Sequence, residues 1–483
     1  MTRLSAQNLP GNIQSYSYDR EAVGTGIVHF GIGNFHRAHQ AVYVEDLLER
    51  GDMRWGITGV SLRSASMRDL LAPQDYLYAL AILGETTSYR VIGAIKGVLV
   101  APQEPQAVID LLAQSATQLV STTITEKGYS LASGAVDFEH PSLKAEAASL
   151  DNPTSIYGFL ARGIILRSQQ EATSKLTIMC CDNISAGGEI LKSGVEHLLT
   201  LHDPDALRWA EDNVSFISSM VDRVSPATDD ALREAVFKDT GQEDASPVSA
   251  EPFSQWIIED NFAGERPDFD KVGADFVGDI APFERMKLRY LNCAHTIAST
   301  LGYLSGDKYV HESLARPNLL KFMRQALYQN VLPNAAVPTG YDGDGYIQDV
   351  FGRFQNGNLP YANLQVGTDS SQKIQQRWFP TIDQALANKT DTSYFEFCVA
   401  AWVIFIQSAL EKGVLNDPKK SVFAQVDTEN LEQIISSYLT IANAEQFTFF
   451  SDAVFMASVT RHAKDIQAKG IKRAIVNFLD GCA

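Results

Sequence analysis

The feature that most limits how this chain can fold is a repeated order of apolar run, polar turn and helical pattern in its N-terminal part. Residues 26–51, "GIVHFGIGNFHRAHQAVYVEDLLERG", start with an apolar run, pass through a glycine turn and continue with helical periodicity. Similar apolar runs return at 55–62, 118–129 and 175–199, and the last again leads into a helical pattern. This alternation is typical of a parallel, doubly wound α/β sheet, in which ligands collect at the carboxyl ends of the strands.

The pattern changes near residue 280. Stretches such as "FERMKLRYLNCAHTIASTLGYL" (283–304) and "FEFCVAAWVIFIQSALEKG" (395–413) carry helical periodicity, and strand signals become rare. A chain of 483 residues is too long for one typical core, so two domains are expected. We predict a Rossmann-like domain over 1–279 and a mainly helical domain over 280–483. The polar stretch "QVGTDSSQKIQQR" (365–377) is interpreted, on its residues alone, as a solvated loop.

Charge and cysteine content exclude several classes of partner. The formal net charge is −18, from 40 basic and 58 acidic residues, which argues against nucleic acid or an anionic membrane but leaves room for a small anionic substrate. The N-terminus has no apolar core that would form a secretory signal, and the apolar run 397–406 is too short to span a bilayer and predicts a buried helix. We expect a cytoplasmic monomer. The five cysteines show no zinc-type spacing, so no metal is expected; they are Cys180, Cys181, Cys293, Cys398 and Cys482.

The glycine turn "GIGNFHR" (31–37) lies between an apolar run and a helical pattern. Glycines at such a turn let the backbone approach a pyrophosphate, which then sits at the start of the helix. The third glycine of the dinucleotide fingerprint is replaced by His36, and an ordinary glycine turn is the alternative. The strand–turn–helix context favours a nucleotide. The candidate cofactor-binding residues of this segment are Gly31, Ile32, Gly33, Asn34, Phe35 and Arg37.

The residues after the second strand bear on the choice between NAD and NADP. An acid that would hold the adenosine ribose is expected there, but "GVSLRSASMRD" (59–69) has no acid before Asp69. Arg63 could neutralise a 2′-phosphate, although a solvated arginine is the alternative. We therefore expect NAD, with NADP possible. Asp222, in "MVDRVSP" (220–226), is a further cofactor candidate, and an ion pair with Arg223 is its alternative.

Two further polar motifs follow strands or turns. Asn183, in "CDN" (181–183), could donate to a substrate oxygen or could cap the following helix. The two histidines of "HRAH" (36–39) resemble a metal pair, but no third ligand lies nearby in the sequence. We interpret this pair as not binding metal.

The segment "MKLRYLNCAH" (286–295) places three polar side chains in an otherwise apolar run. On an α-helix, at about 100° per residue, Lys287, His295 and Asn292 fall near roughly 0°, 80° and 140°. They share one side and could line one pocket. The alternative is a lysine that reaches solvent above a core in which Asn292 and His295 are hydrogen-bonded.

Taken together, these motifs resemble the long-chain polyol dehydrogenases of the mannitol dehydrogenase and fructuronate reductase family. The similarity runs nearly end to end, through "GIGNFHRAHQ", "TITEKGY", "CDN", "MVDR", "EPFSQW" and "EDNF". Its most specific part is Lys287-x4-Asn292-x2-His295, because this zinc-independent family uses a K-x4-N-x2-H pattern for its chemistry.

The resemblance implies a role for each residue of this pattern. Lys287 would be the general base that takes the hydroxyl proton as hydride leaves carbon for the nicotinamide. Asn292 and, from the first domain, Asn183 would stabilise the developing alkoxide, His295 would orient the substrate, and Glu284 would pass the proton outward. A lysine that works near neutral pH needs burial or a positive neighbour to lower its pKa, and the apolar helix offers burial.

The resemblance leaves the substrate open. Gln365 stands where mannitol-specific members tend to have arginine, and together with Lys373 it leans toward the fructuronate reductases, while "GVSLRS" resembles the mannitol branch. D-mannitol/D-fructose is the leading pair and D-mannonate/D-fructuronate the alternative. A non-catalytic dinucleotide-binding sensor is the rival of another class, and an intact lysine–asparagine–histidine set disfavours it. Cys293 and Ala294 depart from the family pattern and are expected to add bulk beside the asparagine.

Overall fold

The computed structural model describes residues 2–132, 134–170, 174–426 and 429–481. The chain divides into two compact units, residues 1–281 and 282–483. All strands in the described residues belong to the first unit, and from Ala281 on every described element is helical. The predicted fold class, a doubly wound α/β part followed by a mainly helical part, is confirmed. Four cysteines are buried free thiols, and Cys482 lies outside the described residues.

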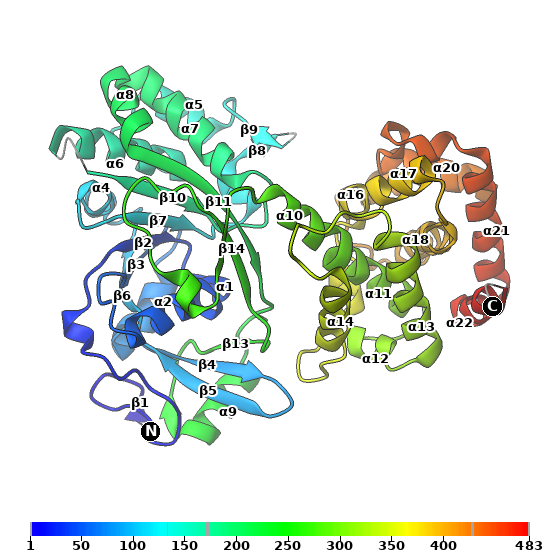
Figure 1. The fold of residues 1–483 in the computed structure, drawn as a ribbon, viewed down its shortest axis with the longest axis horizontal. Helices are drawn as coiled ribbons and strands as arrows, with labels where there is room; N and C mark the ends of the chain where they lie inside the picture. The colour runs from blue at the N-terminus through cyan, green and yellow to red at the C-terminus, as the bar shows by residue number, and fades with distance from the viewer. Residues whose placement is uncertain (1, 133, 171–173, 427–428, 482–483) are drawn as a thin grey trace. The chain divides into compact units, whose positions relative to one another are not determined.

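The first unit is built on an eight-stranded sheet (Figure 1). Its neighbouring strands run parallel except for the antiparallel pair β11–β14. In spatial order the strands are β15 (Asp275–Val277), β14 (Gln255–Glu259), β11 (Val214–Asp222), β10 (Leu176–Cys180), β7 (Leu119–Thr122), β2 (Ile27–Phe30), β3 (Ile57–Ser61) and β6 (Ile95–Val100).

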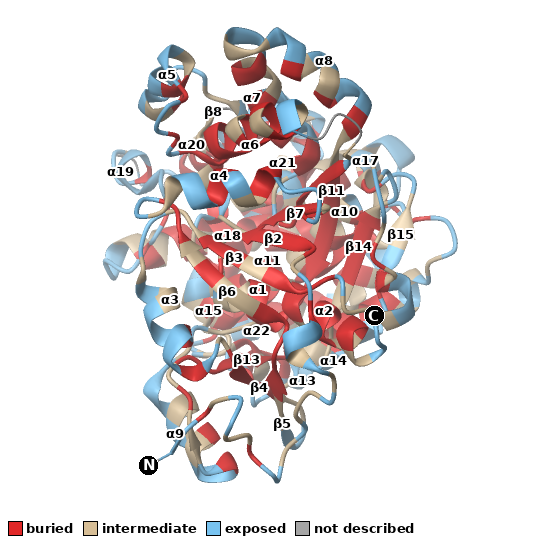
Figure 2. Ribbon diagram, turned by 90° about the vertical axis from the view of Figure 1, so that its left-hand side faces the viewer, coloured by how far each residue is buried: buried red, intermediate tan, exposed pale blue. Residues whose placement is uncertain are grey.

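Both faces of this sheet are covered, which explains why its strands are continuous apolar runs. In β2, Ile27 packs into one hydrophobic cluster and Val28 and Phe30 pack into the cluster on the other face. Figure 2 shows the central strands as buried. Strands buried on both faces lose the alternation of polar and apolar residues that marks a half-exposed strand.

Most helices of the first unit flank this sheet, whereas α9 (Asp230–Thr240) lies beside β5 (Thr87–Ile92) of a smaller sheet (Figure 1). The helices are α1 (Asn34–Ala38), α2 (Gln40–Glu49), α3 (Ser66–Leu71), α4 (Pro105–Ala113), α5 (Pro141–Ala148), α6 (Ile156–Gln170), α7 (Gly187–His202), α8 (Pro204–Asn213) and α9, with 3₁₀ turns η1 (Arg20–Ala22), η2 (Ala72–Gln74), η3 (Glu126–Tyr129) and η4 (Phe269–Val272). The smaller sheets are β13 (Val248–Ala250) with β4 (Tyr78–Leu83) and β5 (Thr87–Ile92), β1 (Thr2–Arg3) with β12 (Gln242–Glu243), and β8 (Leu131–Ala132) with β9 (Ala135–Val136).

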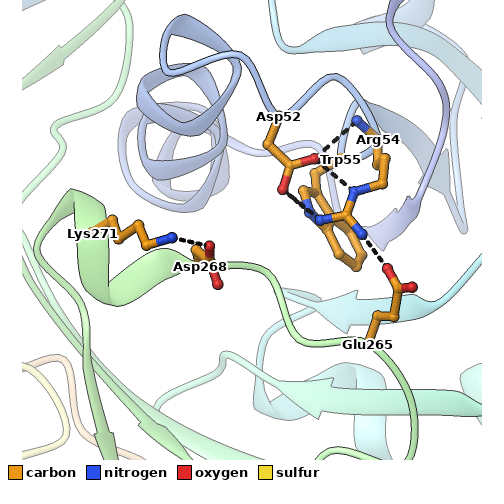
Figure 3. A network of polar contacts seen from close by, with 6 residues as sticks. All are labelled: Asp52, Arg54, Trp55, Glu265, Asp268 and Lys271. Atoms are coloured by element: carbon orange, nitrogen blue, oxygen red, sulfur yellow. Dashed lines mark hydrogen bonds and ion pairs between the residues drawn. The ribbon is translucent and has the colours of Figure 1, made fainter.

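A charged network on the surface holds the segment that enters β3 (Figure 3). The guanidinium of Arg54 donates to both carboxylate oxygens of Asp52, each at 2.8 Å, and also forms an ion pair with Glu265. The indole N–H of Trp55 donates to the same Asp52 carboxylate at 2.9 Å. Because these residues precede β3, they lie at the amino end of that strand, away from the edge where ligands are expected. The network therefore has a structural role.

The second unit packs its helices around α18 (Ser393–Glu411), whose apolar run 397–406 is a buried helix, as predicted. By length and composition α18 could cross a membrane, but 67% of its apolar window is buried. The other elements are α10 (Ala281–Lys287), α11 (Cys293–Leu304), α12 (Val310–Leu314), α13 (Pro317–Gln325), α14 (Gly343–Phe354), α15 (Asn363–Val366), α16 (Ser370–Arg377), α17 (Phe379–Asn388), α19 (Lys420–Phe423), α20 (Leu431–Ile441), α21 (Ala453–Lys469) and α22 (Ile471–Gly481), the π-helical segments η5 (Leu288–Asn292) and η6 (Ala326–Val331), and the 3₁₀ turns η7 (Ala444–Gln446) and η8 (Thr448–Ser451).

The predicted solvated loop at 365–377 is wrong, because most of it forms α16. The helix is polar in composition, but its side chains have specific partners inside the second unit. The Ser371 hydroxyl donates to the carboxylate of Asp417 at 2.7 Å, and the Trp402 indole donates to the Ser370 hydroxyl at 3.1 Å. Buried hydroxyls with such partners stabilise a helix that hydrophobic periodicity does not reveal.

Candidate functional site

The candidate residues of the first unit gather at the carboxyl edge of the sheet. The register pairs Phe30 of β2 with Thr122 of β7, and Thr122 with Cys180 of β10, so these strands end side by side. The backbone N–H of Cys181 donates to the Thr122 carbonyl at 3.0 Å, which carries the alignment one residue past the strand ends. The segments that follow β2, β7 and β10 therefore share one edge, as the sequence predicts for parallel strands.

The turn after β2 has the backbone that a pyrophosphate requires. Gly31 has φ +102°, and a Cβ at this position would collide with the carbonyl oxygen of Thr123. Gly33 is exposed, and a Cβ there would meet nothing within 4 Å. Ile32 points the other way and packs over Gly59 of β3, where any side chain would collide with it. The turn thus needs glycine at 31 and leaves the backbone at 33 open to a ligand, so it fits a dinucleotide.

A chain of hydrogen bonds with a fixed proton order supports this turn. The Thr123 hydroxyl donates to the Gly31 carbonyl at 2.8 Å, so it must accept from His29 Nε2, which lies 2.8 Å away. His29 therefore carries its proton on Nε2, and its Nδ1 accepts from the Ser121 hydroxyl at 2.7 Å. Burial lowers the pKa of His29 to about 3, so the neutral ring persists through the physiological range.

His36 occupies the position of the missing third glycine. Its ring stacks on His29 of β2 with 3.5 Å between ring centroids and an angle of 15°. In a dinucleotide fingerprint the third glycine allows close packing of helix on strand. Here a flat imidazole lying on a second imidazole achieves a close approach. Burial lowers the pKa of His36 well below its usual value, so no positive charge is expected at this contact.

Two of the predicted cofactor ligands, Asn34 and Arg37, are engaged inside the protein. Arg37 is fully buried, donates to the Ser246 carbonyl and, at 2.8 Å, to the side-chain oxygen of Asn34. The Asn34 amide nitrogen donates to the Pro226 carbonyl and the Thr228 hydroxyl, each at 3.0 Å. Arg37 is thus not presented to a ligand in this structure, and both residues hold the turn in place. Phe35 is half-buried and stacks on His39 with centroids 5.1 Å apart.

The structure places the other two cofactor candidates at the ends of β3 and β11. Arg63 is exposed two residues beyond β3, whereas Asp69 is paired with Arg68 at 3.1 Å. Asp222 is buried at the carboxyl end of β11. Its neighbour Arg223 donates to the backbone carbonyls of Ala38 and Glu251, so this arginine fastens α1 and the segment before β14 to the sheet.

Asn183 is exposed just after β10, and a neighbouring carboxylate fixes the loop beside it. The alternative role of Asn183 as a helix cap is wrong, because the residue at the N-terminal cap of α7 is Ala186. Asp182 accepts from the backbone N–H groups of Ile124 and Thr125, at 3.0 and 2.8 Å, and from the Tyr129 hydroxyl at 2.6 Å. These bonds join the "TEKGY" and "CDN" segments. Burial raises the pKa of Asp182.

The second unit holds the lysine, asparagine and histidine on one helical stretch, but the helix is not α-helical throughout. Lys287 ends α10 and is 9% exposed; Asn292 ends the π-helical segment η5, and His295 lies in the first turn of α11. The backbone N–H of Cys293 donates to the Leu288 carbonyl, which is the i to i+5 bond of a π-helix. This wide turn brings residues five apart, such as Lys287 and Asn292, to nearly the same side.

The neighbours of this stretch complete the candidate set. Glu284 lies three residues before Lys287 in α10, a spacing that makes helical side chains neighbours. The His295 ring lies 4.1 Å from the ring of Phe354 and 5.8 Å from that of Tyr361, measured between centroids. The expectation that Cys293 and Ala294 add bulk beside the asparagine is wrong, because both are fully buried in the hydrophobic core of the second unit.

The substrate candidates Gln365 and Lys373 come from adjacent helices. Gln365 is exposed on α15, and Lys373 on α16 donates to the Val366 carbonyl at 3.2 Å and to the Thr368 hydroxyl at 3.5 Å. The ammonium group therefore lies beside the residue that follows Gln365. Arg377, one turn further along α16, donates to the Asn292 carbonyl at 3.2 Å and to the Thr296 hydroxyl at 2.9 Å.

Sequence reasoning did not foresee the contacts of several residues that shape these sites. Thr123 and Asp182 lie in the quoted segments "TITEKGY" and "CDN", and Arg377 ends the stretch 365–377, but each bonds to groups that only the fold brings near. A partial signal existed for Asp182 and Thr123, since both directly follow predicted strands. In the described part of the chain, no group of three or more histidine, cysteine, aspartate or glutamate side chains is arranged to hold a metal ion.

Comparison with known proteins bears on both units. The family model described as the mannitol dehydrogenase Rossmann domain matches residues 25–271, and the mannitol dehydrogenase C-terminal domain matches residues 279–467. Together the two models span most of the chain.

Similarity to individual proteins extends over nearly the whole length. A polyol:NADP oxidoreductase of Gluconobacter oxydans is 32% identical, and the D-mannonate oxidoreductase of Escherichia coli is 33% identical; each alignment covers 98% of this chain and 99% of the relative. Among solved structures, a ternary complex of Pseudomonas fluorescens mannitol 2-dehydrogenase with NAD and D-mannitol matches with a TM-score of 0.84 and 33% identity. That match covers 99% of this chain and 100% of the other.

Proposed function

The chain belongs to the mannitol dehydrogenase family, and from this premise we propose that it is an NAD-dependent, zinc-independent dehydrogenase that interconverts a polyol and its 2-ketose. D-mannitol and D-fructose are the leading pair. The observation that carries the proposal is the π-helical turn between Lys287 and Asn292, with His295 one turn further on. We assign the first unit to dinucleotide binding and the second to the substrate.

The cofactor is held, in this proposal, at the carboxyl edge of the sheet in the first unit. Gly31 and Gly33 would supply the turn that accepts the pyrophosphate, and Arg63, exposed beyond β3, would contact the adenosine ribose. When bound, the nicotinamide supplies the hydride acceptor or donor. Because no acid before Asp69 follows β3 and Asp69 is paired with Arg68, discrimination against a 2′-phosphate is expected to be modest. NAD is the expected cofactor, and NADP is accepted.

The proton chemistry is assigned to residues of the second unit. Lys287, largely buried, takes the proton from the substrate hydroxyl, and Glu284, three residues earlier, passes it outward. The amide of Asn292 donates to the oxygen on which negative charge develops, and Asn183 is assigned the same task from the first unit. His295, set against Phe354 and Tyr361, orients the substrate hydroxyls.

A second candidate substrate pair is D-mannonate and D-fructuronate. It is supported by Gln365 and the nearby ammonium of Lys373, which could hold a carboxylate through a charge-assisted hydrogen bond. It is also supported by the identity of 33% to the E. coli D-mannonate oxidoreductase, which equals the identity to the P. fluorescens mannitol 2-dehydrogenase structure. A non-catalytic sensor would need no base, so the Lys287 set argues against it.

The experiment that tests this proposal is a screen of polyols and aldonates with NAD and NADP, followed by nicotinamide absorbance. We expect NAD reduction with D-mannitol and a smaller rate with NADP. Turnover of D-mannonate but not D-mannitol would favour the aldonate alternative. Binding of NADH without turnover of any polyol or aldonate would favour the sensor. We further propose a cytoplasmic monomer that uses no metal, with neither nucleic acid nor membrane as a partner.

A further inference from the structure

The π-helical turn η5 in the second unit is held by side chains at the end of another helix. At the end of α16, Arg377 Nη1 donates to the Asn292 carbonyl at 3.2 Å and the Trp378 indole donates to the Cys293 carbonyl at 3.4 Å. Two consecutive residues thus bind two consecutive carbonyls at the junction where η5 returns to α-helix. π-helical turns are rare and occur often at functional sites, so the residues that hold this turn are candidates for a functional role.

The hydroxyl of Thr296 links the two partners of Arg377. It accepts from Arg377 Nη1 at 2.9 Å and donates to the Asn292 carbonyl at 3.1 Å. The carbonyl of Asn292 therefore receives two side-chain donors, one from its own helix and one from α16. Because the side chain of Asn292 starts from this backbone, these donors fix the position from which its amide extends.

The desolvation of the Arg377 guanidinium costs free energy, which argues against a role in stability alone. In the described chain Arg377 forms no ion pair, and both of its acceptors are neutral. Burial lowers the pKa of Arg377 to about 10, so the guanidinium stays charged at neutral pH. Arg377 is partly buried, and Arg377→Met removes the desolvation cost of its charge. The Asn292 carbonyl keeps the donor from Thr296, so Arg377→Met should preserve the fold.

We propose that Arg377 is a positioning residue for the reaction: by holding the Asn292 carbonyl at the end of the π-helical turn, it keeps the Asn292 amide aligned with Lys287. The inference rests on the proposed function of Lys287 and Asn292. It also assigns α16 a second task, because Lys373 lies one turn before Arg377 and the two are neighbours on the helix surface. The helix then fixes the substrate-selecting lysine in register with the catalytic stretch.

The test compares Arg377→Met with Gln376→Met, an exposed neighbour on the same helix. For Arg377→Met we expect kcat on the polyol to fall by roughly 10- to 100-fold, since a misplacement of about 1 Å can cost about that much. The affinity for NADH, measured by fluorescence titration, and the melting temperature should stay near those of the parent. Arg377→Lys should recover part of the loss, because an ammonium can still donate to one carbonyl. Gln376→Met should behave as the parent.

Three results would overturn the proposal. One is an unchanged kcat in Arg377→Met. The second is a loss of activity that follows the loss of folded protein in thermal melts, and the third is an equal loss in Gln376→Met. Lys287→Ala, measured alongside, separates this inference from the proposed function. If Lys287→Ala is inactive and Arg377→Met is fully active, only the positioning role fails; if Lys287→Ala is fully active, the base assignment fails as well.

Discussion

At the scale of single residues, the structure shows how much of the candidate sites depends on contacts that no motif reveals. Thr123 is the example in the first unit. Its hydroxyl has two partners, and the bond to the Gly31 carbonyl fixes the direction of the other, from His29 Nε2–H to Thr123. A residue outside the glycine motif thus determines the tautomer of a buried histidine and holds the carbonyl of the glycine on which the turn depends.

Thr123→Val tests whether this chain of hydrogen bonds serves cofactor binding. The change removes the donor to Gly31 and leaves His29 Nε2–H buried without its partner, which should cost about 1–3 kcal/mol of stability. We expect the affinity for NADH to fall several-fold while kcat changes little, the pattern of a lost binding interaction. Fluorescence titration and initial rates measure the two quantities. Thr58→Val in β3 is the matched control; an equal loss of NADH affinity there would contradict the role of Thr123.

At the scale of elements, the sequence predicted the order of strands and helices well but not the local helix type. Apolar runs and helical periodicity located β2, β3, β7, β10 and α7, because these elements are buried on one or both faces. On an α-helix Lys287 and Asn292 would be about 140° apart, and the π-helical turn removes most of that angle. Periodicity cannot reveal the turn, since its anchors Arg377 and Trp378 lie more than 80 residues away in the chain.

Helix α16 was also missed, because the partners that stabilise it, Asp417 and Trp402, are distant in the sequence. This helix carries Lys373, on which a prediction about substrate choice rests. If Lys373 contacts the far end of the substrate, Lys373→Met should reduce kcat/KM for an aldonate more than for a polyol. The difference should be about 1.5–3 kcal/mol, the value of a hydrogen bond to a charged group. Comparing kcat/KM for D-mannitol and D-mannonate in one variant isolates it. The exposed Lys321→Met is the control, and an equal loss on both substrates would mean that Lys373 serves a group common to them.

At the scale of the whole molecule, the fold class follows from patterns spread over hundreds of residues, whereas site residues depend on single contacts. The change of sequence pattern near residue 280 corresponds to a change from α/β to helical structure. Arg37 shows what sequence patterns do not predict. The dinucleotide motif suggests that Arg37 contacts a ligand, but the fold buries its guanidinium against Ser246 and Asn34. Sequence patterns report burial and periodicity well, but they do not say whether a polar group faces a ligand or the protein.

The proposed independence from metal concerns the whole chain and can be tested on the intact enzyme. The side chains assigned to the chemistry are a lysine, a glutamate, two asparagines and a histidine. One histidine and one carboxylate are fewer than the three protein ligands that a catalytic zinc usually has. Activity should therefore survive prolonged treatment with EDTA. Metal analysis of the purified protein is the accompanying control. Stoichiometric zinc, together with loss of activity on its removal and recovery on its return, would contradict this prediction.

The measurement that tests the central claim most directly is the turnover of Lys287→Ala on the best polyol found in the screen. Loss of a general base should lower kcat by about 10²–10⁴-fold, while NADH titration and thermal melts show that the cofactor site and the fold are retained. The exposed Lys321→Ala, in the same unit, should match the parent. A kcat for Lys287→Ala within a factor of about three of the parent would contradict the assignment of Lys287 as the base.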